Sequence, residues 1–371
     1  MTYSETLTQA FDIIRRTIPK MGTDRPAIGR SDLTYERCHD SHWVDGFWSG
    51  QLWLAYGETH DTAFLEAARA QRPYFIERLD RPNSHDHDLG FLYTLTLVAD
   101  TKLTGDEEAC RGAVRAATAL AGRYNARGRF IPAWTWQADS DPNRGRIIID
   151  CLENLALLFW AAQQVHEPCY REIAVAHANT TLETIIRADD STYHSFVFDP
   201  DTGAPLYGET VQGYADDSCW SRGQAWGIHG YATAYRYTGD ARYRAAAVRL
   251  ADYALARLPD DSVPLWDFLL PDGEPPYRDT SAGAIMASGL FLLADVLDDA
   301  AQAAFFRASA RAILDGLIAG YTTFDHPQAE GLLTQGASHV AKGLANNMLP
   351  YGDYFFIEAL LRAQSRTAFF W

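Results

Sequence analysis

Two kinds of helical segment alternate along this chain. In the first kind, apolar residues cover most of the circumference, as in residues 89–98 and 155–162. In the second, apolar residues recur every three to four positions among Arg, Glu and Ala, as in residues 62–79 and 241–258. The second pattern predicts amphipathic helices with one buried face, and the first predicts helices enclosed by others. We therefore expect inner helices wrapped by outer ones.

An acidic residue opens each of six apolar stretches, at intervals of roughly 40 to 75 residues, which is typical of repeated helix pairs. These residues are Asp45, Asp88, Asp150, Asp217, Asp279 and Asp353. An Asp at a helix start is first of all an N-cap or a charge that the helix dipole favours. In a ring of such helix pairs, all six carboxylates would lie at one end.

The order of the segments predicts that the ring closes. Five apolar stretches are each followed by an amphipathic one, whereas the sixth, 354–363, has no helix after it and residues 5–17 have no inner partner before them. Pairing these two gives six hairpins, an all-α (α/α)6 barrel that forms a single domain over residues 1–371 without a linker. An open helical solenoid would need polar capping repeats. The apolar residues 368–371 favour closure instead.

Long connections precede the inner helices. They span residues 80–87, 124–149, 188–216, 259–278 and 320–352, with short strand-like runs such as 193–198. Long loops at one end of a rigid ring are where functional sites usually lie. We therefore expect the site at the end that carries the six acids.

Composition narrows the function. A net charge of −16 argues against nucleic acid and against an anionic membrane surface. No apolar run is long enough to span a bilayer, and the first residues lack a secretory signal, so we expect a cytoplasmic protein. The five cysteines show no Cys-x-x-Cys spacing, which argues against disulfides and structural zinc. Aromatic residues reach 13%, either to fill the core or to stack on sugar rings.

Two of the acids stand out as chemical candidates. Asp88 ends the run His85-Asp-His-Asp before an apolar helix, and Asp150 is carried into an apolar setting by Arg146-Ile-Ile-Ile. Burial and a second carboxylate raise the pKa of a carboxyl group. Two carboxyls with separated pKa values are the usual equipment for protonating a glycosidic substrate. The alternative, a metal site at the His-Asp-His-Asp run, would need further ligands.

A second cluster is Cys219-Trp-Ser-Arg-Gly-Gln-Ala-Trp226. It places Arg222 between two large rings, Trp220 and Trp226. This arrangement is either a packed Arg stacked on Trp or a clamp for a sugar that carries a carboxylate.

Five motifs carry a resemblance to a known family: Trp43-Val-Asp-Gly-Phe-Trp-Ser-Gly, His87-Asp-Leu-Gly-Phe, Arg146-Ile-Ile-Ile-Asp-Cys-Leu-Glu-Asn-Leu, Ser191-Thr-Tyr-His-Ser-Phe and Trp220-Ser-Arg-Gly-Gln-Ala-Trp-Gly. From Glu5 to Arg362, the chain resembles the unsaturated glucuronyl hydrolases of glycoside hydrolase family 88. The resemblance implies an (α/α)6 barrel, an essential acid/base at Asp150 and a supporting Asp88. The substrate-binding positions that it implies are Trp43, His87, Trp134, His194, Gln212, Trp220, Arg222, Trp226 and Lys342.

The resemblance also implies a reaction. The substrate would be an oligosaccharide, made by a polysaccharide lyase, that ends in a uronate with a C4=C5 double bond. Asp150 would protonate C4, and water would add at C5, with no metal or organic cofactor. The alternatives are an unsaturated rhamnogalacturonyl hydrolase with the same chemistry, a sugar 2-epimerase, which would need a histidine pair, and a non-catalytic sugar-binding barrel. The sequence carries no signal for an oligomeric state.

The chain departs from the family pattern in two places. Members that favour sulfated disaccharides carry a Ser-x-x-Ser-x-Lys loop, and the matching residues here are Ala337, Val340 and Lys342. Ser338 stands where relatives often have Tyr, and Pro350-Tyr351 replaces Ile-Trp. These changes bear on the sugar that is released rather than on the reaction.

Overall fold

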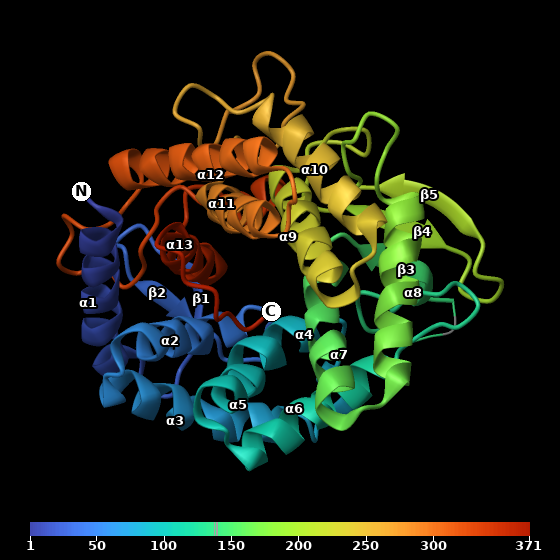
Figure 1. Cartoon of the computed structure of the whole chain (residues 1–371), viewed down its shortest axis with the longest axis horizontal. Helices are drawn as coiled ribbons and strands as arrows, with labels where there is room; N and C mark the ends of the chain where they lie inside the picture. Colours follow the sequence, from blue (N-terminus) through green and yellow to red (C-terminus); the bar gives the residue numbers. More distant parts are fainter. Residues whose placement is uncertain (137, 139) are drawn as a thin grey trace.

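In the computed structural model, which describes residues 1–136, 138 and 140–371, six inner helical segments form a closed ring (Figure 1). Neighbouring segments pack in the order α2, α4, α7, α9, α11, α13 and back to α2. Their bounds are α2 (Asp45–Thr59), α4 (Leu89–Tyr93) with the π-helical turn η2 (Thr94–Val98) and α5 (Ala99–Thr104), α7 (Cys151–Val165), α9 (Ser221–Thr238), α11 (Thr280–Asp295) and α13 (Pro350–Ala363). The predicted (α/α)6 barrel is confirmed.

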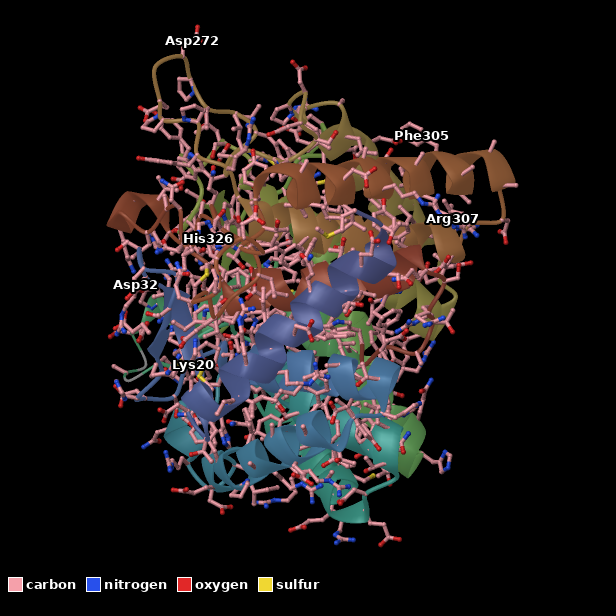
Figure 2. All side chains as sticks on the ribbon, turned by 90° about the vertical axis from the view of Figure 1, so that its left-hand side faces the viewer. Lys20, Asp32, Asp272, Phe305, Arg307 and His326 are labelled. Carbon is pink, nitrogen blue, oxygen red and sulfur yellow. The ribbon has the colours of Figure 1, made fainter. Side chains whose placement is uncertain are left out.

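The outer helices surround this ring (Figure 1). They are α1 (Tyr3–Met21), α3 (Thr62–Arg78), α6 (Glu107–Ala121), α8 (Pro168–Thr184), α10 (Ala241–Leu255) and α12 (Ala300–Gly320). Helix α1 contacts α13, so the first and last helices complete the ring as predicted. Exposed side chains such as Lys20, Asp32 and Asp272 lie on the outside (Figure 2). None of the helices in the described part of the chain is long and apolar enough to cross a membrane.

Four of the outer helices begin at aspartate N-caps. Asp61, Asp106, Asp240 and Asp299 are N-caps whose carboxylates accept hydrogen bonds from backbone N–H groups of the first turn. Such caps satisfy donors that a helix start leaves unpaired. Apolar residues then face the inner ring, as in α10, where Tyr243, Ala246, Ala247 and Leu250 are buried.

Close approach of the inner helices depends on small residues. A Cβ at Gly90 of α4 would lie 2.2 Å from the Asn154 Cα of α7, so only glycine fits at this crossing. The buried apolar surface continues around the ring with little interruption, which is the physical reason for the apolar circumference seen in the sequence.

Short strands and turns organise the long connections. Strands β1 (Pro26–Gly29) and β2 (Tyr35–Arg37) pair antiparallel, and β3 (Arg146–Ile148), β4 (Ser195–Phe198) and β5 (Pro205–Glu209) form an antiparallel sheet in that order. Among the described residues, three 3-10 turns complete the loops: η1 (Pro82–Ser84), η3 (Pro142–Gly145) and η4 (Val340–Lys342). The Ile149 N–H donates to the His194 carbonyl at 2.9 Å. The sheet therefore brings Asp150 beside His194.

One expected helix start is wrong. Asp217 is exposed in a turn, and α9 begins four residues later at Ser221, with Trp220 as its N-cap. The buried acid at this place is Asp267, whose Oδ1 accepts the Cys219 N–H at 3.1 Å and whose Oδ2 accepts the Ser218 hydroxyl at 2.6 Å. A loop distant in sequence therefore supplies the carboxylate, which local spacing could not indicate.

A polar cluster lies in the middle of the ring. Glu358 accepts hydrogen bonds from Arg362 at 3.0 Å and from the Trp371 indole at 2.9 Å. His229 lies 2.9 Å from both Glu153 carboxylate oxygens and 3.4 Å from Glu358. The end of the chain thus lies inside the ring (Figure 1). Two carboxylates facing an arginine and a histidine keep the buried charge nearly balanced.

Candidate active site

Asp88 and Asp150 lie at the starts of two adjacent inner helices, α4 and α7. Both are N-cap residues, yet neither side chain accepts a capping hydrogen bond. Asn154 connects the two helix starts: its amide nitrogen lies 3.4 Å from Asp88 Oδ1 and 3.3 Å from the Asp150 carbonyl, and its Oδ1 accepts the Phe91 N–H at 2.7 Å. The two carboxyl groups are therefore held in place but remain available for chemistry.

The pKa values of both carboxyl groups are raised, so the pair still holds a proton near neutral pH. Burial and the charge of Asp88 raise the pKa of Asp150 to about 7. Burial likewise raises the pKa of Asp88 to about 7, although the Asn154 amide opposes the rise. Asp86, whose carboxylate accepts the Asp88 N–H at 3.0 Å, has its pKa raised by burial to about 6. Because neighbouring carboxyls share protons, the pair can act as an acid near neutral pH.

His194 is held as a neutral ring with its N–H near Asp150. Its Nδ1 accepts the backbone N–H groups of Val211 and Gln212, each at 3.1 Å. A ring nitrogen that accepts two N–H groups carries no proton, so the proton is on Nε2. Burial and the charge of Arg222 lower the pKa of His194 to about 3. Nε2 lies 3.9 Å from Asp150 Oδ1, as a donor without a partner among the described residues.

His87 occupies the corresponding place beside Asp88. Its Nε2 lies 3.3 Å from Asp88 Oδ1, and burial lowers the pKa of His87 to about 4. Neither ring nitrogen forms a hydrogen bond within the described structure, and the same holds for Asp150 Oδ1. Buried polar groups without partners are rare in folded proteins. Their convergence here marks a place built to receive a polar ligand.

Of the two interpretations of Arg222, the structure supports a packed arginine that stacks on Trp220 and holds neighbouring residues in place. It is fully buried, forms an ion pair with Asp279 and donates to the Ala337 carbonyl at 2.8 Å. Its other terminal nitrogen donates to Gln212 Oε1 at 2.8 Å and to the Ser338 carbonyl at 2.9 Å. The guanidinium lies 4.5 Å from the Trp220 ring centroid. Arg222 therefore holds Gln212 and residues 337–338 in place, while its charge still acts on the site.

The four tryptophans differ in position. Trp43 and Trp134 are half-buried, with the Tyr351 ring 4.8 Å from Trp43 and the Arg146 guanidinium 5.9 Å from Trp134. Trp220 lies against His194, with ring centroids 4.4 Å apart. Trp226 is completely buried between core aromatic rings. Because Trp226 has no exposed surface, it cannot stack on a substrate sugar, and the expectation that it does so is wrong.

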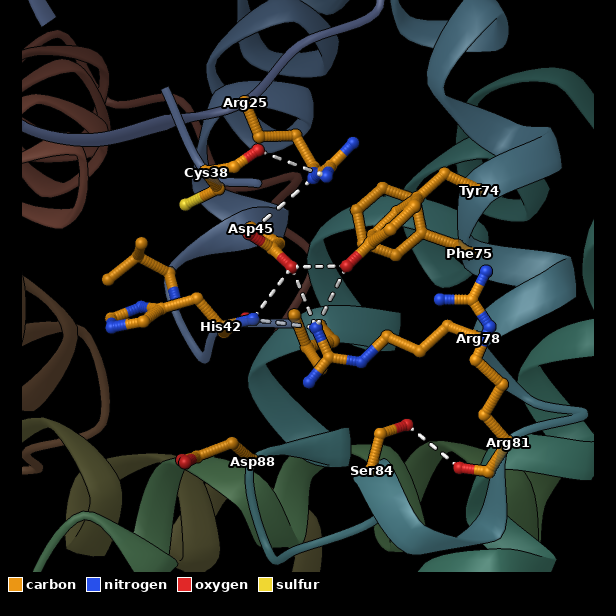
Figure 3. A network of polar contacts seen from close by, with 12 residues as sticks. Arg25, Cys38, His42, Asp45, Tyr74, Phe75, Arg78, Arg81, Ser84 and Asp88 are labelled. Carbon is orange, nitrogen blue, oxygen red and sulfur yellow. Dashed lines mark hydrogen bonds and ion pairs between the residues drawn. The ribbon is translucent and has the colours of Figure 1, made fainter. Parts of the chain in front are cut away.

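The loop that carries Trp43 is fixed by a buried ion-pair network (Figure 3). Asp45 Oδ2 accepts the His42 N–H at 3.0 Å, the Tyr74 hydroxyl at 2.6 Å and Arg78 at 2.7 Å. Arg25 lies 3.5 Å from the other carboxylate oxygen. Asp45 is thus a structural acid that orients the start of α2.

Two further acids of the six are also structural. Asp279 Oδ1 caps α11 by accepting the Ser281 and Ala282 N–H groups. Asp353 accepts the Tyr35 hydroxyl at 2.6 Å and the Leu333 N–H at 3.0 Å. Burial also raises the pKa of Asp353 to about 7, but both of its carboxylate oxygens are occupied by Tyr35 and Leu333. Asp88 and Asp150 combine raised pKa values with carboxyl groups that accept no capping bond.

The side chains of the His85-Asp-His-Asp run turn to different partners. His85 Nε2 lies 3.3 Å from the Arg78 carbonyl, whereas His87 turns toward Asp88. Within the described residues, no three His, Cys, Asp or Glu side chains gather closely enough to hold a metal ion. Lys342 is exposed at the end of η4.

Two residues at this site were not predicted from the sequence. Asn154 lies one helical turn after Asp150, a spacing that could have indicated contact between them, but its hydrogen bond to Phe91 depends on the packing of α4 against α7. In the sequence, Tyr351 stands out only as a departure from the family pattern. It lies beside Trp43 because α13 packs against α2, a contact between distant parts of the chain.

Comparison with known proteins agrees with this arrangement. The profile of glycosyl hydrolase family 88 matches residues 14–355. An unsaturated glucuronyl hydrolase of Bacillus sp. strain GL1 is 41% identical over 372 residues, covering 100% of this chain and 98% of that protein. An unsaturated chondroitin disaccharide hydrolase of Streptococcus pyogenes serotype M1 is 38% identical over 366 residues, covering 96% and 91%.

Solved structures give the same result. The crystal structure of the unsaturated glucuronyl hydrolase from Bacillus sp. GL1 is similar, with a TM-score of 0.93 at 41% identity, covering 97% of this chain and 96% of that one. The enzyme from Streptococcus agalactiae also gives a TM-score of 0.93, at 34% identity, covering 100% and 93%. This chain belongs to glycosyl hydrolase family 88.

Proposed function

We propose that this protein is an unsaturated glucuronyl hydrolase that removes a 4,5-unsaturated uronic acid from the non-reducing end of lyase-generated oligosaccharides. One observation carries the proposal beyond family membership. Asp88 and Asp150 are buried at adjacent helix starts, with pKa values near 7 and without capping bonds. A carboxylic acid that is protonated near neutral pH is what protonation of an enol ether requires.

The reaction begins with proton transfer to carbon. Asp150 gives its proton to C4, the electrons of the C4=C5 bond form the new C–H bond, and positive charge develops at C5 next to the ring oxygen. Water then adds at C5 and returns a proton to the Asp150 carboxylate. The resulting hemiketal opens, and C1 becomes a hemiacetal that releases the next sugar as an alcohol. One water is consumed, and no group attacks C1, so the carboxyl-separation rule for glycosidases does not apply.

The neighbouring groups divide the remaining work. Burial and the charge of Asp88 raise the pKa of Asp150 and so keep the acid protonated. His194 offers a fixed N–H donor near Asp150, because its other nitrogen accepts two backbone N–H groups. Trp43, Trp134 and Trp220 supply ring faces that suit the C–H side of a sugar. His87 and Gln212 also bind the substrate in this proposal.

The test is hydration itself. Purified protein should abolish the ultraviolet absorbance of the conjugated uronic acid in a panel of unsaturated disaccharides from chondroitin, hyaluronan, heparin, gellan and xanthan. Including the unsaturated rhamnogalacturonan disaccharide separates the main alternative, because only the preferred leaving sugar differs. Unchanged absorbance with every substrate would contradict the proposal. The cytoplasmic location expected from the sequence stays a prediction.

A further inference from the structure

We infer that Tyr351 is a substrate-binding residue whose hydroxyl donates a hydrogen bond to the carboxylate of the unsaturated uronate. The inference rests on the proposed function and adds to it the recognition of the substrate's anionic group. It concerns a residue at which this chain departs from the family pattern.

The Tyr351 ring is tightly fixed. Tyr351 is the second residue of α13 and is only 1% exposed. Its ring lies 4.8 Å from that of Trp43 and 5.9 Å from that of Phe47, and the Arg222 guanidinium lies 5.2 Å from its centroid. These contacts hold the side chain on three sides, so the direction of its hydroxyl is set by packing.

The hydroxyl itself has no hydrogen-bond partner among the described residues. The Ser338 side chain lies near enough to lower the pKa of Tyr351 but does not meet hydrogen-bonding geometry. Leaving a buried hydroxyl unpaired is unfavourable. Phenylalanine would pack equally well here without leaving a hydroxyl unpaired. The tyrosine therefore points to a ligand that accepts the hydrogen bond of its hydroxyl.

The surroundings identify the ligand as an anion. The charged groups near enough to act on the hydroxyl are Arg222, Asp279 and Asp150. Burial raises the pKa of Tyr351 to about 12, and the phenol therefore remains a donor at neutral pH. His194 Nε2–H is a second donor without a partner near Asp150. Two free donors beside an arginine suit a carboxylate.

The chemistry of the substrate fits this placement. In the unsaturated uronate, the carboxylate is attached to C5, and C5 is bonded to C4. A donor that holds the carboxylate near Asp150 therefore also positions C4 for the proton. Because the carboxylate is present before and during the reaction, this hydrogen bond stabilises the bound substrate and the transition state alike. Its loss should raise KM and leave kcat nearly unchanged.

The experiment compares Tyr351→Phe with Tyr231→Phe. Tyr231 is the matched control, because its hydroxyl is also buried without a partner but lies on α9 against Tyr243. Steady-state constants are measured with an unsaturated disaccharide and with its methyl ester. For the acid, Tyr351→Phe should raise KM roughly 10- to 100-fold, the typical effect of losing a charge-assisted hydrogen bond. For the ester, the two variants should differ little from the wild type.

A second measurement separates binding from catalysis. In an Asp150→Asn background, calorimetry should give weaker binding of the acid with Tyr351→Phe added and unchanged binding with Tyr231→Phe added. If the wild type turns over the substrate and Tyr351→Phe has the same KM as the wild type, this inference is overturned while the proposed function stands. The same conclusion follows if Tyr351→Phe raises KM equally for the acid and for the ester. Absence of turnover by the wild type would overturn the proposed function and this inference together.

Discussion

At the scale of single residues, the environment decides what an Asp at a helix start does. Asp106 and Asp240 are also N-caps, but backbone N–H groups and arginines lower their pKa values. Asp88 and Asp150 occupy the same helix position without these hydrogen bonds, and burial raises their pKa values to about 7. The helix dipole alone, which favours the carboxylate, is therefore outweighed by desolvation.

Replacing Asp150 by Asn should nearly abolish turnover, because an amide cannot give a proton to C4. General acid catalysis is typically worth roughly 100- to 10,000-fold, and a loss within this range is expected. Asp88→Asn should also be severely impaired. Asp217→Asn is the control, since Asp217 is exposed in a turn, and its activity should equal that of the wild type. Retention of more than about a tenth of activity by Asp150→Asn would exclude it as the acid.

The pH dependence should report the same group. The pKa of Asp150 is raised to about 7, so its carboxyl group is protonated below this pH and loses its proton as the pH rises through it. The specificity constant kcat/KM should therefore fall on the alkaline side of a mildly acidic optimum. Because the Asp88 charge raises the pKa of Asp150, the alkaline decrease in the residual activity of Asp88→Asn should occur at a lower pH than in the wild type. A profile that is flat up to about pH 9 would contradict the assignment.

At the scale of elements, the sequence pattern predicts where the helices lie but not the contacts that their connecting loops make. Apolar stretches preceded by Asp88 and Asp150 could be predicted as inner helices because the signal is local. The 89–98 stretch nevertheless includes the π-helical turn Thr94–Val98. Asp267 replaces Asp217, and Tyr351 reaches Trp43, through contacts between segments distant in sequence. Such contacts leave no local periodicity to detect.

The segment 336–347 should set the preference for the leaving sugar. It folds back on itself through paired backbone groups of Gly336 with Asn347 and of His339 with Leu344. The carbonyls of Ala337 and Ser338 point at Arg222 and are acceptors. Lys342 is exposed and supplies only a flexible charge. The segment therefore offers few donors to a sulfate, whose burial without donors is unfavourable.

We expect kcat/KM to favour an unsulfated over a sulfated unsaturated chondroitin disaccharide by roughly tenfold or more, since each missing hydrogen bond to a charged group is costly. The variant Ala337→Ser with Val340→Ser adds hydroxyl donors and should narrow this preference. Equal or faster turnover of the sulfated disaccharide by the wild type would show that other residues bind the sulfate.

At the scale of the whole molecule, ring closure could be predicted because every inner helix but one is followed by an outer helix, and the chain ends supply the missing pair. The single domain over residues 1–371 stays a prediction. The polar centre of the ring was not foreseen, because Glu153, His229 and Glu358 read in the sequence as isolated polar residues on apolar helices. Their partners come from different helices across the ring.

Trp371 is expected to contribute strongly to the stability of the ring. It is completely buried, its ring stacks on Phe355 at 5.7 Å, and its indole donates to Glu358 at 2.9 Å. Trp371→Ala removes this packing and one donor to a buried carboxylate, and should lower the free energy of unfolding by about 3–5 kcal/mol. The control is Phe305→Ala on α12, a large aromatic side chain that is 52% exposed (Figure 2). Denaturant unfolding should show a change within about 0.5 kcal/mol for this control. Equal effects of the two substitutions would mean that the segment inside the ring is not part of its cooperative core.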